Sequence, residues 1–244
     1  MSTQADGANL QHDDEPHGAG IAGKLNWLRA GVLGANDGIV SVAAVVVGVA
    51  GATSDISPIL TAGIAALVGG AISMALGEYV SVSSQRDSQR ALIAKERQEL
   101  IDDPEAELDE LTGLYEAKGL SPATARQVAI ERTEHDALAA HLDVELQITE
   151  SEIVSPWHAA FASALAFILG AILPLVAIVL PPESVRVPIT FASVLVALAI
   201  TGTVGAKIGG SPVIRPALRV IIGGALALIV TFAIGSLLGT AGIV

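Results

Sequence analysis

Long uncharged stretches and one long polar stretch alternate along the chain. A helix needs roughly 20 apolar residues to cross the roughly 30 Å of hydrocarbon in a membrane. Five stretches are long enough, at residues 31–52, 59–80, 159–181, 187–206 and 217–241. Glycines crowd these stretches and let helices approach closely in lipid. The pattern therefore predicts an all-α membrane protein with five transmembrane helices.

The polar stretch after the second span, residues 83–156, predicts a three-helix insert. We expect the second span to continue as helix until the Asp-Asp-Pro run that ends at Pro104, because a proline disfavours helix in the residue before it. A second helix over about 105–118 ends at Gly119, a typical helix C-cap. A third begins at Pro122, directly after a serine N-cap, and extends to about residue 150.

Four parts of the chain follow from these expectations. They are a disordered acidic tail (1–23), transmembrane helices 1 and 2 (24–82), the insert (83–156) and transmembrane helices 3 to 5 (157–244). The tail has no Lys or Arg and lacks the basic-then-apolar order of a signal peptide.

Basic residues predict the orientation, because Lys and Arg accumulate on the cytoplasmic side of a membrane. Two precede the first span, seven lie in the insert and three follow the fourth span, whereas the opposite side has Arg186 alone. We therefore expect a cytoplasmic N-terminus and insert and an external C-terminus. The acidic tail and the lack of a targeting signal favour a bacterial inner membrane.

Composition and charge exclude several classes of protein, partner and metal site. The chain is 52% hydrophobic and 16% charged, with a mean hydropathy of +0.62, which is too apolar for an ordinary soluble domain. Its net charge of −12 argues against nucleic acid and favours a cationic partner. Without cysteine, any metal site must use oxygen, imidazole or thioether ligands.

Asp37 is a carboxylate about one and a half turns inside an otherwise apolar span, which costs roughly 2.5 kcal/mol or more. We interpret it as a cation or proton site that faces a pathway. The alternative is a structural aspartate, capped or paired at a turn and helped by its neighbours Asn36 and Gly38.

Met74 and Glu78 lie four residues apart, so a thioether and a carboxylate share one helix face. A soft and a hard ligand side by side suit a borderline divalent metal better than calcium or magnesium. The alternative is a methionine that fills a packing gap beside a hydrated glutamate.

The insert holds 17 acidic residues against seven basic ones. They include three E-x-x-E pairs, Glu96 with Glu99, Glu107 with Glu110, and Glu131 with Glu134. Like charges at this spacing destabilise a helix, so three such pairs invite a cation between them. In one long third helix, His141 and Glu145 follow Glu134 along the same stripe. The alternative is a solvated acidic surface.

Four segments together resemble the vacuolar iron transporter family. They are GANDGIVS (34–41), SMALGEYVSVSSQRD (73–87), SALAFILGAILPL (163–175) and ALRVIIGG (217–224). The resemblance covers about residues 24–244 and implies five spans with a cytoplasmic insert. It also implies a homodimer that exports ferrous iron, and often manganese, from the cytosol in exchange for protons.

Carried over residue by residue, the resemblance assigns metal binding to eight residues. They are Asp37, Met74 and Glu78 in the spans and Glu96, Glu99, Glu107, Glu110 and Glu145 in the insert. Where other members have a methionine pair, this chain has His141 and Leu142, which makes His141 a further candidate ligand. Imidazole in place of thioether keeps Fe²⁺, Mn²⁺, Zn²⁺, Co²⁺ and Ni²⁺ as candidate ions.

Two other functions would also account for some of these features. A membrane-anchored di-iron ferroxidase would need Glu-x-x-His pairs, and the histidines of this chain lack that spacing. A metal sensor that does not transport would leave Asp37 and Met74 without a role. The sequence therefore predicts a transporter of divalent metal and protons, not an enzyme, with no organic cofactor and no nucleic-acid partner.

Overall fold

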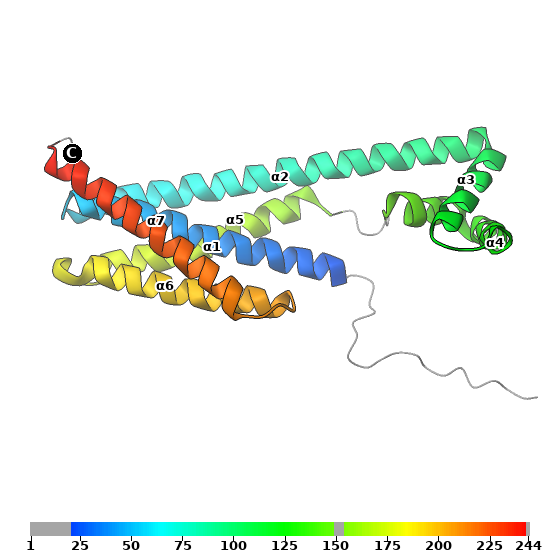
Figure 1. Ribbon diagram of the computed structural model, residues 1–244. Helices are drawn as coiled ribbons and strands as arrows, with labels where there is room; N and C mark the ends of the chain where they lie inside the picture. The colour runs from blue at the N-terminus through cyan, green and yellow to red at the C-terminus, as the bar shows by residue number, and fades with distance from the viewer. Residues whose placement is uncertain (1–20, 149–153, 243–244) are drawn as a thin grey trace, which may run out of the picture. The chain divides into compact units, whose positions relative to one another are not determined.

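The computed structural model describes residues 21–148 and 154–242, and this part of the chain is all-helical. Five helices are long and apolar enough to cross a membrane, as the hydropathy pattern predicted (Figure 1). They are α1 (Ile21–Ala52), α2 (Ile56–Asp102), α5 (Pro156–Val179), α6 (Glu183–Ile208) and α7 (Ile214–Thr240). Most of the predicted acidic tail, residues 1–20, lies outside the described residues.

Helix α2 is much longer than a membrane is thick. Its 47 residues, at 1.5 Å each, extend over about 70 Å. Only its first half, through residue 80, is apolar, so the polar second half extends beyond the hydrocarbon. The predicted continuation of the second span into the insert is therefore a single unbroken helix.

The chain forms two compact units. One combines the residues up to Ile72 with those from Ala162 onward, and the other is Ser73–Phe161. In the first unit, α1 packs against both α6 and α7, which also contact each other. In the second unit, α3 (Pro104–Ala117) packs against α4 (Pro122–His141) and the π-helix η1 (Leu142–Leu146).

Glycines allow the helices of the first unit to touch backbone to backbone. A methyl group on Gly38 of α1 would overlap the carbonyl oxygen of Phe167 on α5, and one on Gly235 of α7 would overlap the carbonyl oxygen of Gly48. Between α6 and α7, a methyl on Gly202 would lie 2.9 Å from the Cα of Ala217. Close packing of this kind is what holds helices together in lipid, where apolar surface alone does not.

Local capping signals set the helix ends in the second unit. Asp103 accepts a hydrogen bond from the Ala106 amide at 3.1 Å and is the N-cap of α3, so Pro104 begins a helix as well as ending one. Gly119 has φ +98°, the left-handed conformation that glycine adopts readily after a helix. Ser121 caps α4 as the sequence predicted.

The third insert helix is not the single helix to residue 150 that the sequence suggested. Asp136 has φ −162° and ψ 97°, so α4 breaks there and restarts, with the Asp136 carboxylate accepting from the Ala139 amide at 2.9 Å. The restarted segment then passes into η1 and ends with Gln147 in a left-handed conformation. Residues 149–153 lie outside the described residues.

Candidate metal centre

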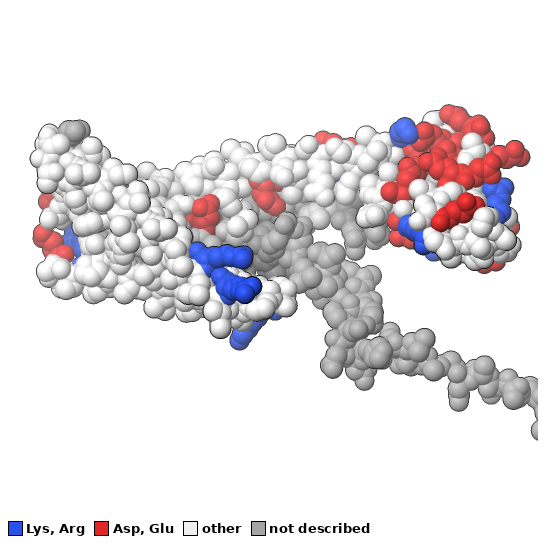
Figure 2. All heavy atoms as spheres, in the orientation of Figure 1, with Lys and Arg blue, Asp and Glu red and all other residues white. Residues whose placement is uncertain are grey.

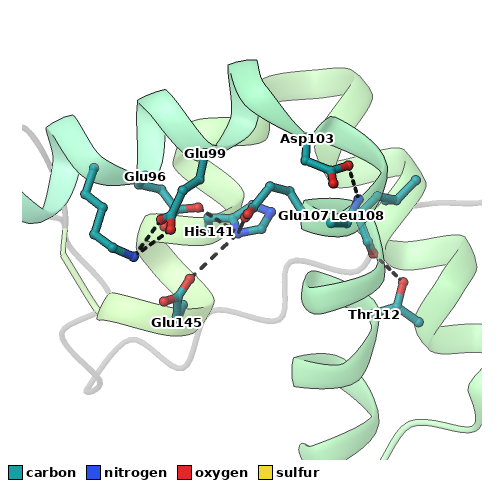
Figure 3. A network of polar contacts seen from close by, with 10 residues as sticks. Glu96, Glu99, Asp103, Glu107, Leu108, Thr112, His141 and Glu145 are labelled. Carbon is teal, nitrogen blue, oxygen red and sulfur yellow. Dashed lines mark hydrogen bonds and ion pairs between the residues drawn. The ribbon is translucent and has the colours of Figure 1, made fainter.

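Three buried side chains from three helices meet in the second unit. Glu96 comes from α2, Glu107 from α3 and His141 from the end of α4, and one donor atom of each lies within 4.8 Å of the other two. The Nδ1 atom of His141 is 2.9 Å from Oε1 of Glu96 and 3.6 Å from Oε2 of Glu107 (Figure 3). Oε2 of Glu145, one turn later, lies 3.8 Å from the same nitrogen.

These donor atoms are buried without conventional hydrogen bonds. His141 has 0% exposure and Glu96 has 4%, yet both ring nitrogens and the Glu96 Oε1 lack a hydrogen-bond partner in the described structure. Nδ1 and Oε1 lie within ion-pair distance of each other, but no hydrogen bond is formed between them. Buried polar atoms are almost always satisfied, so this arrangement requires an explanation.

The spacing of the donors fits a shared metal ion. Two ligands at about 2.1 Å from one metal lie about 3.0 to 3.4 Å apart, for angles between octahedral and tetrahedral. The 2.9 and 3.6 Å separations around His141 Nδ1 bracket this range. Ligands of one metal point at the metal and not at each other, so short separations without hydrogen bonds are compatible with a metal site.

Further carboxylates surround this core. The side chains of Glu145 and Glu99 are 30% and 39% exposed, and Glu110 is exposed. Burial, followed by the charges of Glu145, Glu107, Glu99 and Glu110, raises the pKa of Glu96 from 4.5 to about 7. The five insert glutamates that the resemblance named thus form one electrostatic cluster.

Glu107 responds to the same cluster. Its pKa is raised, first by burial and then by Glu110, while His141 acts in the opposite direction. Both glutamates lie beyond the apolar part of the chain, since Glu96 is 16 residues, or about 24 Å, past residue 80 of α2. A divalent ion would stabilise the ionised form of both and relieve the repulsion between them.

Acidic side chains dominate the surface of the second unit around the cluster. Figure 2 shows them gathered over the end of α2 and over α3. Three basic residues contact the second unit's helices near the cluster: Lys95 binds Glu99, Arg132 pairs with Asp143 at 3.1 Å, and Lys118 donates to the Val144 carbonyl at 3.3 Å.

The third E-x-x-E pair is not part of the cluster. Glu131 and Glu134 are exposed, and Glu131 accepts a hydrogen bond from Gln127 at 2.7 Å. The break at Asp136 separates Glu134 from His141, so the single stripe expected from helical spacing does not form. Sequence reasoning missed Asp136, although aspartate inside a helix is a poor helix former and a strong N-cap, which is the signal that points to the break.

Asp37 lies on an exposed part of α1, inside the apolar stretch. Its Oδ1 accepts a hydrogen bond from Ser41 Oγ at 2.6 Å, and no described residue forms an ion pair with it. The neighbouring Asn36 accepts from Thr201 of α6. The hydrogen bond from Ser41 supports a structural role for Asp37, but no cationic side chain in the described part of the chain pairs with it.

Met74 and Glu78 are both half-buried on α2, one turn apart. They belong to the second unit, whereas Asp37 belongs to the first. Close to Glu78, the Tyr79 ring contacts Trp157 of α5, with ring centroids 4.7 Å apart. This aromatic pair lies where the apolar stretch of α2 ends, as is usual for side chains at a membrane interface.

Comparison with known proteins places these residues in a family. Residues 28–236 match the VIT family. The vacuolar iron transporter of Acanthamoeba castellanii is 43% identical over 226 residues, which cover 92% of this chain and 83% of that protein. The vacuolar iron transporter homolog 1 of Arabidopsis thaliana is 36% identical over 218 residues, covering 89% and 86%. The chain is therefore a multi-pass membrane protein that belongs to the VIT family.

Proposed function

We propose that this protein transports divalent metal, ferrous iron first, out of the cytosol in exchange for protons. The observation that carries the proposal is the buried cluster of Glu96, Glu107 and His141, whose donor atoms lie within 4.8 Å of one another and could hold a metal ion. The relatives named as iron transporters support iron as the transported ion. The orientation that the basic residues predict places the cluster on the cytoplasmic side of the membrane.

The ligands favour a borderline metal. Carboxylate oxygens together with imidazole suit Fe²⁺, Mn²⁺, Co²⁺ and Zn²⁺, whereas Ca²⁺ and Mg²⁺ bind through oxygen alone. In this proposal Glu96, Glu107 and His141 bind the ion most closely, and Glu99, Glu110 and Glu145 complete the site and attract cations to it. The cluster collects metal before transport.

Asp37, Met74 and Glu78 are the proposed ligands within the spans. A charged side chain inside a membrane faces the interior of a bundle or a water-filled path, not lipid. Because Asp37 is exposed on a single chain, something must cover it, and we propose that a second copy does so in a homodimer. Two copies of Asp37 would then approach each other and attract a divalent cation.

Proton exchange follows from the ligand chemistry. Carboxylates must lose protons to bind metal and regain them when the metal leaves, which couples the two flows at a shared site. Low pH on the loading side therefore weakens metal binding, and low pH on the release side promotes release. Asp37 and Glu78 are the groups through which a proton would return.

Purified protein in liposomes that contain a pH dye tests this proposal. A gradient of Fe²⁺, kept reduced, should produce metal uptake with proton movement in the opposite direction, at clamped membrane potential. Asp37→Asn should abolish most of the flux, whereas Asp55→Asn, a carboxylate in the loop after α1, should not. Metal flux without proton movement would indicate a channel or uniporter, oxygen-dependent oxidation an enzyme, and binding without flux a sensor.

A further inference from the structure

Lys95 lies directly before Glu96 and contacts another carboxylate of the cluster. Its Nζ atom donates to Oε1 of Glu99 at 2.7 Å and to Oε2 at 2.8 Å. Both oxygens of a proposed metal ligand are therefore engaged by an ammonium group of the same helix. Two other basic residues of the insert, Arg126 and Arg132, pair with Asp109 and Asp143, which lie outside the proposed ligand set.

We propose that Lys95 is an internal counter-ion that competes with metal for Glu99 and thereby lowers the affinity of the centre. The inference rests on the proposed metal binding by the insert and adds a residue that sets its strength. In the metal-free protein the ammonium group offsets part of the negative charge of the cluster. When metal binds, it must displace this group from Glu99.

The geometry makes such displacement feasible. The Lys95 side chain is 68% exposed, and a lysine carries its charge on a flexible four-carbon chain. Exposed ion pairs between residues four apart on a helix are weak, so a doubly charged ion with several ligands can replace the ammonium group. A guanidinium at this position would bind the carboxylate in a fixed bidentate geometry and leave less readily.

The electrostatics extend beyond Glu99. Charges on Glu145 and Glu96 also favour the charged form of Lys95, which places the ammonium group in the field of three cluster carboxylates. A positive charge in this position also repels a cation at the centre through space, but solvent screens this repulsion at an exposed side chain, so the contact with Glu99 is the larger effect. Lys95 is therefore a positioning residue for the ligand Glu99 and a limit on how tightly metal is held.

A reduced affinity has a functional consequence. A centre that collects metal for transport must also release it, and six carboxylate and imidazole ligands without a counter-ion would hold a transition metal tightly. Displacement of Lys95 on binding, and its return on release, shortens the time for which metal stays bound. Lys95 makes the cluster a transfer site and not a storage site.

Titration of the purified full-length protein with Co²⁺ tests the inference, because this ion reports its ligands by absorption and does not oxidise readily. Lys95→Met keeps the length of the side chain and removes its charge, and we expect about threefold to fivefold tighter binding. It should also slow Co²⁺ dissociation into excess chelator by a similar factor. Lys95→Arg should bind no more tightly than the wild type.

Two controls separate this role from a general effect of charge. Arg90→Met makes the same charge change on the same helix, at an exposed position, and should change affinity by less than about twofold. In a Glu99→Gln background, Lys95→Met should lose most of its effect, since the two residues act on one contact. Equal affinities for the wild type and Lys95→Met, or an undiminished effect without Glu99, would overturn the proposal.

The same titration distinguishes failure of this inference from failure of the proposed function. If the wild type binds Co²⁺ and Glu107→Gln abolishes binding while Lys95→Met changes nothing, the metal centre stands and the counter-ion role is wrong. If the wild type does not bind Co²⁺ through the insert, the metal centre itself is wrong and the role of Lys95 fails with it.

Discussion

His141 Nδ1 lies 2.9 Å from Glu96 Oε1, and both side chains are buried, yet the two atoms are not hydrogen bonded. A histidine and a glutamate left together in a protein interior would normally turn to share a proton. Their present arrangement, with Glu107 3.6 Å from the same nitrogen, matches donors that converge on a third atom. The packing of α2, α3 and α4 therefore brings together the side chains that we propose as metal ligands.

His141 should contribute directly to metal affinity. We expect His141→Gln, which keeps a polar side chain but removes the imidazole, to weaken Zn²⁺ and Co²⁺ binding by more than about tenfold. Calorimetry on the full-length protein measures this change. His135→Gln alters an exposed histidine on the same helix and serves as the control. Unchanged affinity in His141→Gln would remove imidazole from the ligand set.

The E-x-x-E pairs should differ in importance. Changing Glu99 and Glu107 together to Gln should reduce metal binding to near background, because these carboxylates belong to the cluster of Glu96 and His141. Changing the exposed Glu131 and Glu134 to Gln alters the charge by the same amount and should leave binding within about twofold. Equal losses in both double variants would show that overall charge, and not the cluster, attracts the metal.

The stability of the metal-free protein should depend on pH through Glu96. Burial raises its pKa from 4.5 to about 7, so the folded state favours the protonated carboxyl. Its contribution to the free energy of unfolding is therefore complete below pH 4.5 and is lost as the pH rises through about 7. We expect the melting temperature of the metal-free protein to fall over this interval and to fall less in Glu96→Gln.

Metal binding should have the opposite pH dependence and strengthen as the pH rises. Ionised Glu96 is the form that binds metal, so binding releases protons and weakens as the pH falls below about 7. Titration in two buffers of different ionisation enthalpy counts the protons released. Metal affinity that stays constant between pH 8 and about pH 5 would contradict the assignment of Glu96 as a ligand.

Asp136 should position His141 and Glu145. Asp136→Ala removes the cap on the restarted helix, which should cost about 1 kcal/mol in stability and lower metal affinity severalfold. Asp136→Asn keeps a capping oxygen and should retain both the stability and the metal affinity. Glu134→Ala, two residues earlier and exposed, provides the control. If Asp136→Ala and Glu134→Ala behave alike, the break in α4 does not contribute to the centre.

Gly38 should be intolerant of any side chain. Gly38→Ala places a methyl group against the Phe167 carbonyl and should destabilise the first unit by about 1–3 kcal/mol, because the backbones of α1 and α5 must separate. Gly31→Ala lies on the same helix with nothing within 4 Å and should be neutral or slightly stabilising. Thermal unfolding in detergent compares the two, and equal melting temperatures would contradict the close packing of α1 and α5.

The five spans and the helix ends at Pro104 and Ser121 could be predicted from sequence because they depend on local properties. Hydropathy over about 20 residues identifies a membrane span whatever its neighbours are. A serine or aspartate cap satisfies backbone amides only three residues away. Packing elsewhere in the protein changes neither signal. Candidate ligands such as Glu96 and Glu107 could also be identified from sequence, because each belongs to an E-x-x-E pair within its own helix.

Tertiary structure alone decided which of these residues meet. Helical spacing treated the three E-x-x-E pairs as equivalent and placed Glu134 in line with His141, but the break at Asp136 turns the end of α4 and leaves Glu134 in solvent. Burial of His141 depends on α2, α3 and α4 packing together, and no local pattern contains that information. Local sequence patterns are enough to predict the spans, the polar insert and the candidate ligands. The fold determined which candidates share one site, since that depends on contacts between residues up to 49 positions apart, from Glu96 to Glu145.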